Sequence, residues 1–130
     1  AGKSAFVKLM GFTENRDQLA DILASSDYFL HGSAAETYGI VVAEAVCSGL
    51  PVIVPDRGGA ADIAQDDIGV TYQPGDKNAC ARAIKKIIGL DREKLAEATV
   101  DAAENKIINM KNHFERLFKT YEELLKAKNR

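Results

Sequence analysis

Two glutamates separated by seven residues, Glu36 and Glu44, bracket a stretch in which most residues are apolar. If this stretch is helical, a rise of about 1.5 Å per residue places the two carboxylates about 12 Å apart along the axis. Eight steps of about 100° leave them within about 80° of each other around that axis. One carboxylate at the beginning of a helix and one two turns further on can both accept hydrogen bonds from hydroxyl groups. The spacing therefore predicts a site for a hydroxyl-bearing ligand such as a sugar.

The backbone between the two glutamates would supply a second kind of contact. Tyr38, Gly39 and Ile40 are expected in the first turn of the helix, where backbone N–H groups have no partner within the helix. These groups carry about half a unit of positive charge at the helix N-terminus. Because Gly39 has no side chain, a phosphate could approach the backbone there. A diphosphate at the helix start, with hydroxyl-bearing rings on either side, would match both the amides and the carboxylates.

Each glutamate could instead have a purely structural role, and the spacing alone does not decide between a ligand-binding role and a structural one. Glu36 could be an acid that only favours the helix dipole. Glu44 could be a buried acid that is hydrogen-bonded to backbone amides. A single short motif is a weak signal by itself, so the surrounding elements and the longer pattern have to carry the assignment.

The elements that would position these residues alternate between strands and helices. Short apolar runs predict strands at residues 5–10, 27–31, 51–55 and 69–72. Apolar residues at helical spacing predict helices at 15–25, 38–48, 61–63, 78–90, 91–105 and 109–127. Gly49 stands where a C-cap glycine belongs, and Asn78 is the expected cap of the fourth helix. This order predicts an α/β fold with a parallel sheet of about four strands and helices on both faces, in a single domain over residues 1–130.

Composition excludes several classes of function. The 130 residues carry a net charge of −2, so no global positive field exists to hold nucleic acid. No apolar run approaches the roughly 18 residues that span a bilayer. Cys47 and Cys80 lack the spacing of a metal site and predict buried free thiols in a reducing, cytoplasmic location. Residues 111–130 hold six Lys/Arg and three Asp/Glu; we expect a packing helix there, and a basic helix at a membrane surface is the alternative.

Residues 25–64 resemble the donor-binding core of GT-B glycosyltransferases, most closely the large retaining family 4 with its Glu-x7-Glu hallmark. Glu36 and Glu44 match that pair. The surrounding signature also fits, with Glu-x-aromatic-Gly at residues 36–39, Gly-x-Pro-Val at 49–52 and Gly-Gly at 58–59. Gly32 stands where the family usually has proline, and His31 where it often has an apolar or small residue. We interpret His31 as a strand-end residue rather than a catalytic base.

The resemblance implies a role for each matched residue. Glu36 would contact the transferred sugar as the catalytic residue, and Glu44 would bind the ribose hydroxyls. The amides of Tyr38, Gly39 and Ile40 would hold the donor diphosphate. The reaction would transfer a hexose from a nucleoside-diphosphate sugar to an acceptor with retention. No metal or other cofactor is expected, and the chain contains no Asp-x-Asp tripeptide.

The resemblance also implies that the chain is an incomplete, Rossmann-like C-terminal half of a GT-B enzyme. The acceptor-binding domain and the family's diphosphate-neutralising Arg and Lys have no counterpart here, and Arg57 lies nearby without matching the motif. We therefore expect weak donor binding, no turnover by this chain alone, and a partner in the form of the acceptor domain or another chain. An exposed sheet edge would favour self-association. A non-catalytic partner subunit and a GT-B sugar-nucleotide epimerase are the alternative functions.

Overall fold

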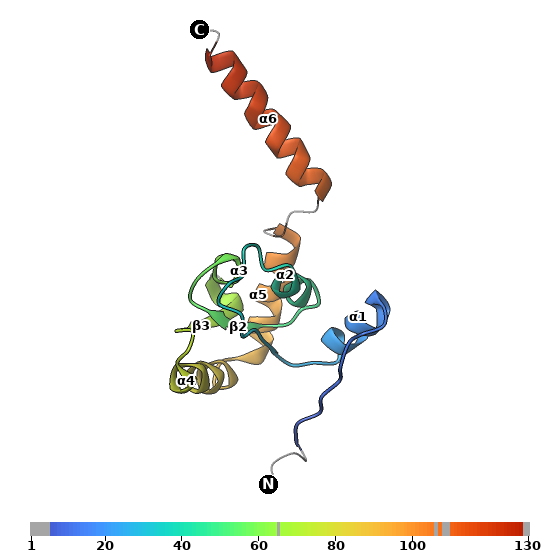
Figure 1. The fold of residues 1–130 in the computed structure, drawn as a ribbon, viewed down its shortest axis with the longest axis vertical. Helices are drawn as coiled ribbons and strands as arrows, with labels where there is room; N and C mark the ends of the chain where they lie inside the picture. Colours follow the sequence, from blue (N-terminus) through green and yellow to red (C-terminus); the bar gives the residue numbers. More distant parts are fainter. Residues whose placement is uncertain (1–5, 65, 106, 108–109, 129–130) are drawn as a thin grey trace.

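The computed structural model describes residues 6–64, 66–105, 107 and 110–128. Within them, three short strands form one parallel sheet in the order β1-β2-β3 (Figure 1). The strands are β1 (Phe29–Leu30), β2 (Val52–Pro55) and β3 (Gly69–Tyr72). The helices are α1 (Arg16–Ala24), α2 (Ile40–Cys47), α3 (Gly59–Ile63), α4 (Lys77–Ile88), α5 (Arg92–Asn105) and α6 (Met110–Lys128), and a 3-10 helix, η2 (Asp66–Ile68), precedes β3.

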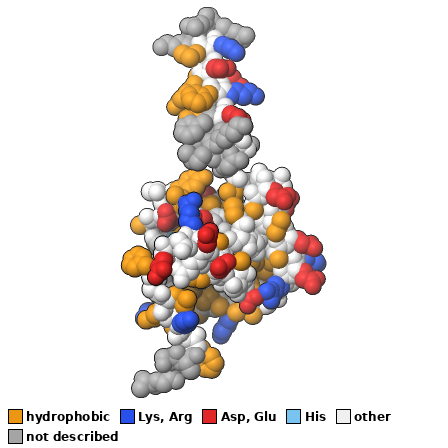
Figure 2. Space-filling view, turned by 90° about the vertical axis from the view of Figure 1, so that its right-hand side faces the viewer, with side chains coloured by type: hydrophobic (Ala, Val, Ile, Leu, Met, Phe, Trp, Pro, Cys, Tyr) orange, Lys and Arg blue, Asp and Glu red, His pale blue; other side chains and the backbone are white. Residues whose placement is uncertain are grey.

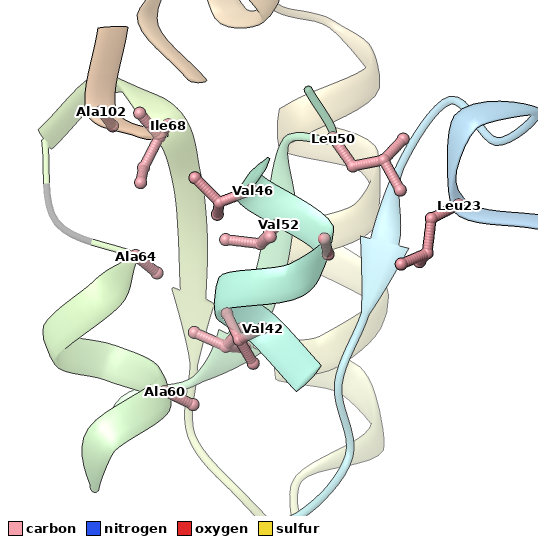
Figure 3. Packing of buried hydrophobic residues seen from close by; sticks show 11 residues of the cluster. Leu23, Val42, Val46, Leu50, Val52, Ala60, Ala64, Ile68 and Ala102 are labelled. Carbon is pink, nitrogen blue, oxygen red and sulfur yellow. The ribbon is translucent and has the colours of Figure 1, made fainter. Parts of the chain in front are cut away.

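Helices cover both faces of the sheet, as the alternation of elements predicts. β2 is a run of β-branched residues and proline that is buried throughout, as expected for a central parallel strand. Val52 and Val54 belong to a cluster built with α2 and α3. Figure 3 shows Val52 beside Val42 and Val46 of α2. Ile53 faces the opposite side and packs in a second cluster with Ile87 of α4. α5 contributes side chains to both clusters, so the two layers are joined on the side of β3.

The strand predicted at residues 5–10 is wrong for the residues that the structure describes, because residues 7–12 form no strand or helix. Phe6, Leu9 and Phe12 are almost fully exposed. A short apolar run becomes a strand only when a neighbouring strand supplies hydrogen-bond partners. Within the described residues β1 pairs with β2 alone, and Leu30 is half exposed at the outer edge. The sheet therefore has three strands here, where about four were expected.

Every helix starts one or two residues away from its predicted position, and the caps explain this difference for α2 and α4. α2 begins at Ile40 because Gly39, with φ +82°, is its left-handed N-cap. α4 begins at Lys77 because the Asp76 carboxylate, rather than Asn78, accepts the first backbone N–H groups. Gly49 has φ +78° and ends α2 as predicted.

α6 extends away from the sheet domain (Figure 1). Phe118, Tyr121, Leu124 and Leu125 are all more than half exposed, and hydrophobic side chains line one side of the helix in Figure 2. The prediction of an ordinary packing helix is therefore wrong for the described residues, since no apolar surface of the sheet domain covers this face. Among the described residues, no helix is both long and apolar enough to cross a membrane.

Candidate functional site

The candidate site lies at the carboxyl end of the sheet, in the loop of residues 31–39 that joins β1 to α2. Two hydrogen bonds hold the beginning of this loop. The His31 N–H donates to the Ile53 carbonyl at 2.9 Å, which continues the pairing of β1 with β2 by one residue. The Tyr72 hydroxyl donates to the His31 carbonyl at 2.8 Å, so the end of β3 also holds this position. The loop therefore starts from a fixed point where three strands end.

Gly58 and Gly59 form the surface on which the rest of the loop rests. The Gly59 N–H donates to the Glu36 carbonyl at 3.0 Å. A Cβ at Gly58 would lie 2.5 Å from the Glu36 carbonyl oxygen, and one at Gly59 would lie 2.5 Å from the Thr37 carbonyl oxygen. Gly39 is similarly restricted, because its Cβ would lie 3.2 Å from the backbone of Ala60. The Gly-Gly pair of the sequence signature thus lets the start of α3 approach the loop backbone.

Glu36 lies where the loop turns into α2, with about 30% of its side chain exposed. Its Oε1 accepts a hydrogen bond from the Gly39 N–H at 3.2 Å. Its Oε2 lies 3.7 Å from Nε2 of His31. The carboxylate is therefore at the start of the helix, as predicted, and it already uses one of the amides that were expected to hold a diphosphate.

Beyond Gly39, the first turn of α2 presents unpaired backbone donors. The Gly39 carbonyl accepts from the Val42 and Ala43 N–H groups, which closes the first turn. In the described part of the chain, the N–H groups of Ile40 and Val41 make no hydrogen bond. Tyr38 and Ile40 carry exposed side chains, and no side chain caps the helix. Among the described residues, the N–H groups of Tyr38, Ile40 and Val41 thus have no hydrogen-bond partner, whereas that of Gly39 is bonded to Glu36. That these amides hold a diphosphate stays a prediction.

Glu44 lies further along α2 and faces a different neighbour. Its Oε1 is 3.9 Å from a terminal nitrogen of Arg16 on α1, and about a third of the side chain is exposed. The two residues border a cavity of about 200 Å³ between α1 and α2, which is lined by Arg16, Leu19, Ala20, Leu23, Glu44, Cys47 and Ser48. Cys47 is exposed as a residue, but partial desolvation raises the pKa of its thiol, and the nearby Glu44 carboxylate raises it further. Glu44 therefore borders a small, partly apolar hollow instead of being a fully buried acid.

The described structure has further hollows. One of about 200 Å³ lies between the loop, α2 and α3 and is lined by Thr37, Tyr38, Ala43, Gly59, Asp62, Ile63 and Ile107. A larger one of about 530 Å³ lies at the amino end of β3, beside Gly69, Lys86 and Asp91. Ligands of parallel sheets bind at the carboxyl ends of strands, so we place the candidate site at the loop of residues 31–39 despite the greater volume elsewhere.

The structure shows the neighbours of three residues near the site, which the sequence alone did not predict. His31 is at the end of β1, as interpreted, but it also faces Glu36. Arg16 is the cation next to Glu44. Arg57 lies after β2, is largely exposed, and is 3.8 Å from the Asp56 carboxylate. The regular spacing within α2 could reveal Glu44, whereas no local pattern links Arg16 or His31 to the acids they face.

A parallel sheet that carries a helix start flanked by acids at its carboxyl end is the arrangement of a Rossmann-like domain. Residues 1–127 match the family described as glycosyl transferases group 1, and the chain belongs to this family. A crystal structure of a glycosyltransferase from Rickettsia africae superimposes with a TM-score of 0.69 at 24% identity, covering 86% of this chain and 31% of that one. This likeness confirms the predicted α/β fold of GT-B type.

Several curated relatives match parts of the chain, among them two named transferases. Sulfoquinovosyl transferase SQD2 of Arabidopsis thaliana is 40% identical over 81 residues, which are 59% of this chain and 16% of the relative. A GDP-mannose-dependent alpha-mannosyltransferase of Mycobacterium tuberculosis is 52% identical over 46 residues, which are 35% of this chain and 12% of the relative. The chain thus spans less than a fifth of the length of either relative.

Proposed function

We propose that this chain is the donor-binding part of a retaining glycosyltransferase that takes a hexose from a nucleoside-diphosphate sugar. The observation that carries the proposal is the pair of open N–H groups at Ile40 and Val41, at the carboxyl end of the sheet and beside Glu36. Glu44 borders a hollow further along the same helix. Sulfoquinovosyl transferase SQD2 and the mannosyltransferase are named as transferases of sugars, which agrees with a sugar donor.

In the proposed reaction, the bond between the sugar C1 and the diphosphate oxygen breaks, and both electrons leave with the diphosphate. The acceptor hydroxyl forms the new bond to C1 on the same face, and its proton passes to the departing diphosphate. The open N–H groups at the start of α2 would stabilise the charge that develops on the leaving group. Glu36 would contact the sugar near C1, where positive charge develops, and Glu44 would bind the ribose hydroxyls.

The diphosphate contact requires one exchange of partners. The Gly39 N–H is bonded to Oε1 of Glu36. For Gly39 to join Tyr38 and Ile40 in holding the diphosphate, as the resemblance implies, the carboxylate has to release that amide. We propose that donor binding includes this release, which frees Glu36 to contact the sugar.

The charges near the site support weak binding by this chain alone. A helix N-terminus contributes about 0.3–1 kcal/mol toward an anion, a small fraction of the roughly 8 kcal/mol of a micromolar complex. Arg16 and Arg57 each lie within 4 Å of a carboxylate, which partly offsets their positive charge. We therefore propose that the acceptor domain or another chain completes the site, and that the open edge of β1 is a surface for association.

A screen of UDP-, GDP- and ADP-hexoses tests the proposal, with binding measured on this chain and turnover on the full polypeptide that carries it. We expect Glu36→Ala to lower turnover by about 100- to 1,000-fold, to a residual rate that can still be measured. Glu44→Ala should weaken donor binding by about tenfold, the loss of a hydrogen bond to a charged group. Glu104→Ala, an exposed glutamate on α5, is the matched control. Full activity of both site variants would contradict the assignment. Binding without turnover in the full polypeptide would favour a non-catalytic partner subunit, and an epimerised donor would favour an epimerase.

Cys47 offers an independent test of where the nucleoside binds. Its thiol is exposed and lines the same hollow as Glu44. A nucleotide sugar bound there should slow alkylation of Cys47 several-fold, while Cys80, on α4, keeps its rate. Equal rates with and without saturating nucleotide would place the nucleoside elsewhere.

The remaining expectations stay proposals. We propose transfer without a bound metal, in keeping with the lack of an Asp-x-Asp tripeptide. We also propose a cytoplasmic location, with peripheral contact to the membrane surface as an option for α6. Cys47 and Cys80 are free thiols, but Cys47 is exposed and Cys80 is half-buried, so the prediction that both are buried is wrong. Free thiols agree with a reducing compartment.

A further inference from the structure

His31 is the residue near the candidate site whose surroundings are least explained by packing. Its side chain is only 12% exposed, and its ring is stacked on Phe29, with the centroids 6.3 Å apart. The Nε2 atom is fully buried and has no hydrogen-bond partner among the described residues. Buried polar atoms are nearly always paired, so an unpaired imidazole nitrogen beside a functional loop calls for a partner in another state of the site.

The group that Nε2 faces is the carboxylate of Glu36. The distance of 3.7 Å to Oε2 exceeds the usual hydrogen-bond range by about half an ångström. The carboxylate is held at this distance because its other oxygen accepts from the Gly39 N–H. A small movement of Glu36 toward β1 would therefore break the bond to Gly39 and close the bond to His31.

We propose that His31 is a positioning residue that donates a hydrogen bond to Glu36 when the donor diphosphate takes the Gly39 amide. This inference rests on the proposed function. A carboxylate that loses its amide partner to an arriving anion becomes an unpaired acceptor beside a like charge, which is unfavourable. The Nε2–H of His31 replaces the lost donor and holds Glu36 in place for the sugar.

The surroundings of His31 suit this role. Its backbone is fixed on both sides, by the Ile53 carbonyl and by the Tyr72 hydroxyl. Phe29 covers the ring. The Glu36 carboxylate lies 3.7 Å from Nε2, so the ring is held in a position that faces the group it is proposed to bind.

Two substitutions at His31 test the proposal in the full polypeptide that carries this chain. Hydrolysis of the preferred nucleotide sugar, in which water takes the place of the unknown acceptor and nucleoside diphosphate is released, gives kcat and KM. His31→Leu keeps an apolar side chain of similar size without a donor, and we expect kcat to fall by about 10- to 100-fold while the donor KM changes by less than about threefold. His31→Gln places an amide N–H at a similar reach and should recover most of the loss. Thermal unfolding shows whether either variant still folds.

A double-variant cycle separates positioning from a general structural effect. In the Glu36→Ala background, His31→Leu should cause no further loss of kcat, because the group that it positions is gone. If His31→Leu keeps the kcat of the unaltered protein, or lowers it equally with and without Glu36, the proposal is overturned. A polypeptide that neither binds nor turns over any nucleotide sugar would instead refute the proposed function itself.

Discussion

The loop of residues 31–39 and helix α6 differ in how they contact segments that are distant in the sequence. The loop has no regular secondary structure, yet β2, β3 and the start of α3 hold it through backbone contacts. α6 is a long, regular helix with an apolar stripe, yet that stripe faces outward (Figure 2). A regular sequence pattern thus predicts a helix or a strand. Whether a segment is held in place depends on its contacts with segments that are distant in the sequence. The candidate site belongs to the region that distant segments hold.

The strongest test of this contrast is a side chain added beneath the loop. Gly59→Ala would place a Cβ 2.5 Å from the Thr37 carbonyl oxygen, so the backbone of the loop or of α3 has to move. We expect the free energy of unfolding to fall by about 1–3 kcal/mol, the usual cost of overpacking. Urea denaturation gives this value. Gly32→Ala, where the new Cβ meets open space, is the control within the same loop. Equal stability of the two variants would show that the loop does not rest on Gly59.

A smaller effect on stability is expected at the start of α4, where the helix cap depends on contacts between residues that are close in the sequence. The Asp76 carboxylate accepts from the N–H groups of Asn78 at 2.8 Å and Ala79 at 3.0 Å. These bonds, that from Ala79 most of all, hold the pKa of Asp76 below its usual range. A carboxyl group whose pKa is lowered by folding stabilises the protein above its unfolded pKa of about 4 and loses this contribution as the pH falls through the folded value.

Asp76→Ala should therefore lower the urea midpoint at pH 7 and flatten the decline in stability below pH 4. Asn78→Ala is the matched control, because Asn78 was the expected cap and Asp76 is the observed one. If Asn78→Ala were the more damaging of the two, the sequence-based choice of cap would be right after all.

These cases show how far the sequence could lead. The buried run of β2 and the stripe of α4 are local patterns, and both elements lie where they were predicted. The strand at residues 5–10 was predicted from the same kind of pattern and fails, because a strand needs a neighbour that the described residues do not supply.

The candidate site also combines residues that local sequence patterns reveal with contacts that depend on the packing of distant segments. Glu36 and Glu44 were found from their spacing along one segment, and Gly58 and Gly59 from a signature. The contact of Glu36 with His31 and that of Glu44 with Arg16 could not be predicted, since each depends on how separate segments pack. The role of the two glycines likewise becomes visible only when the Glu36–Tyr38 backbone is seen to pass over them.

The smallest expected effect lies on α6. Leu125 is 62% exposed, so Leu125→Ala should change the free energy of unfolding of this chain by no more than about 0.5 kcal/mol. Ile87→Ala is the reference, because Ile87 is fully buried on α4 and its truncation should cost about 2–5 kcal/mol. Urea denaturation of both variants gives the comparison. A cost for Leu125→Ala close to that of Ile87→Ala would mean that α6 packs on the sheet domain in solution. A cost that appears only in the full polypeptide would mean that a segment outside this chain covers the helix. The loop and α6 would then both be held by distant segments, and only the position of those segments would differ.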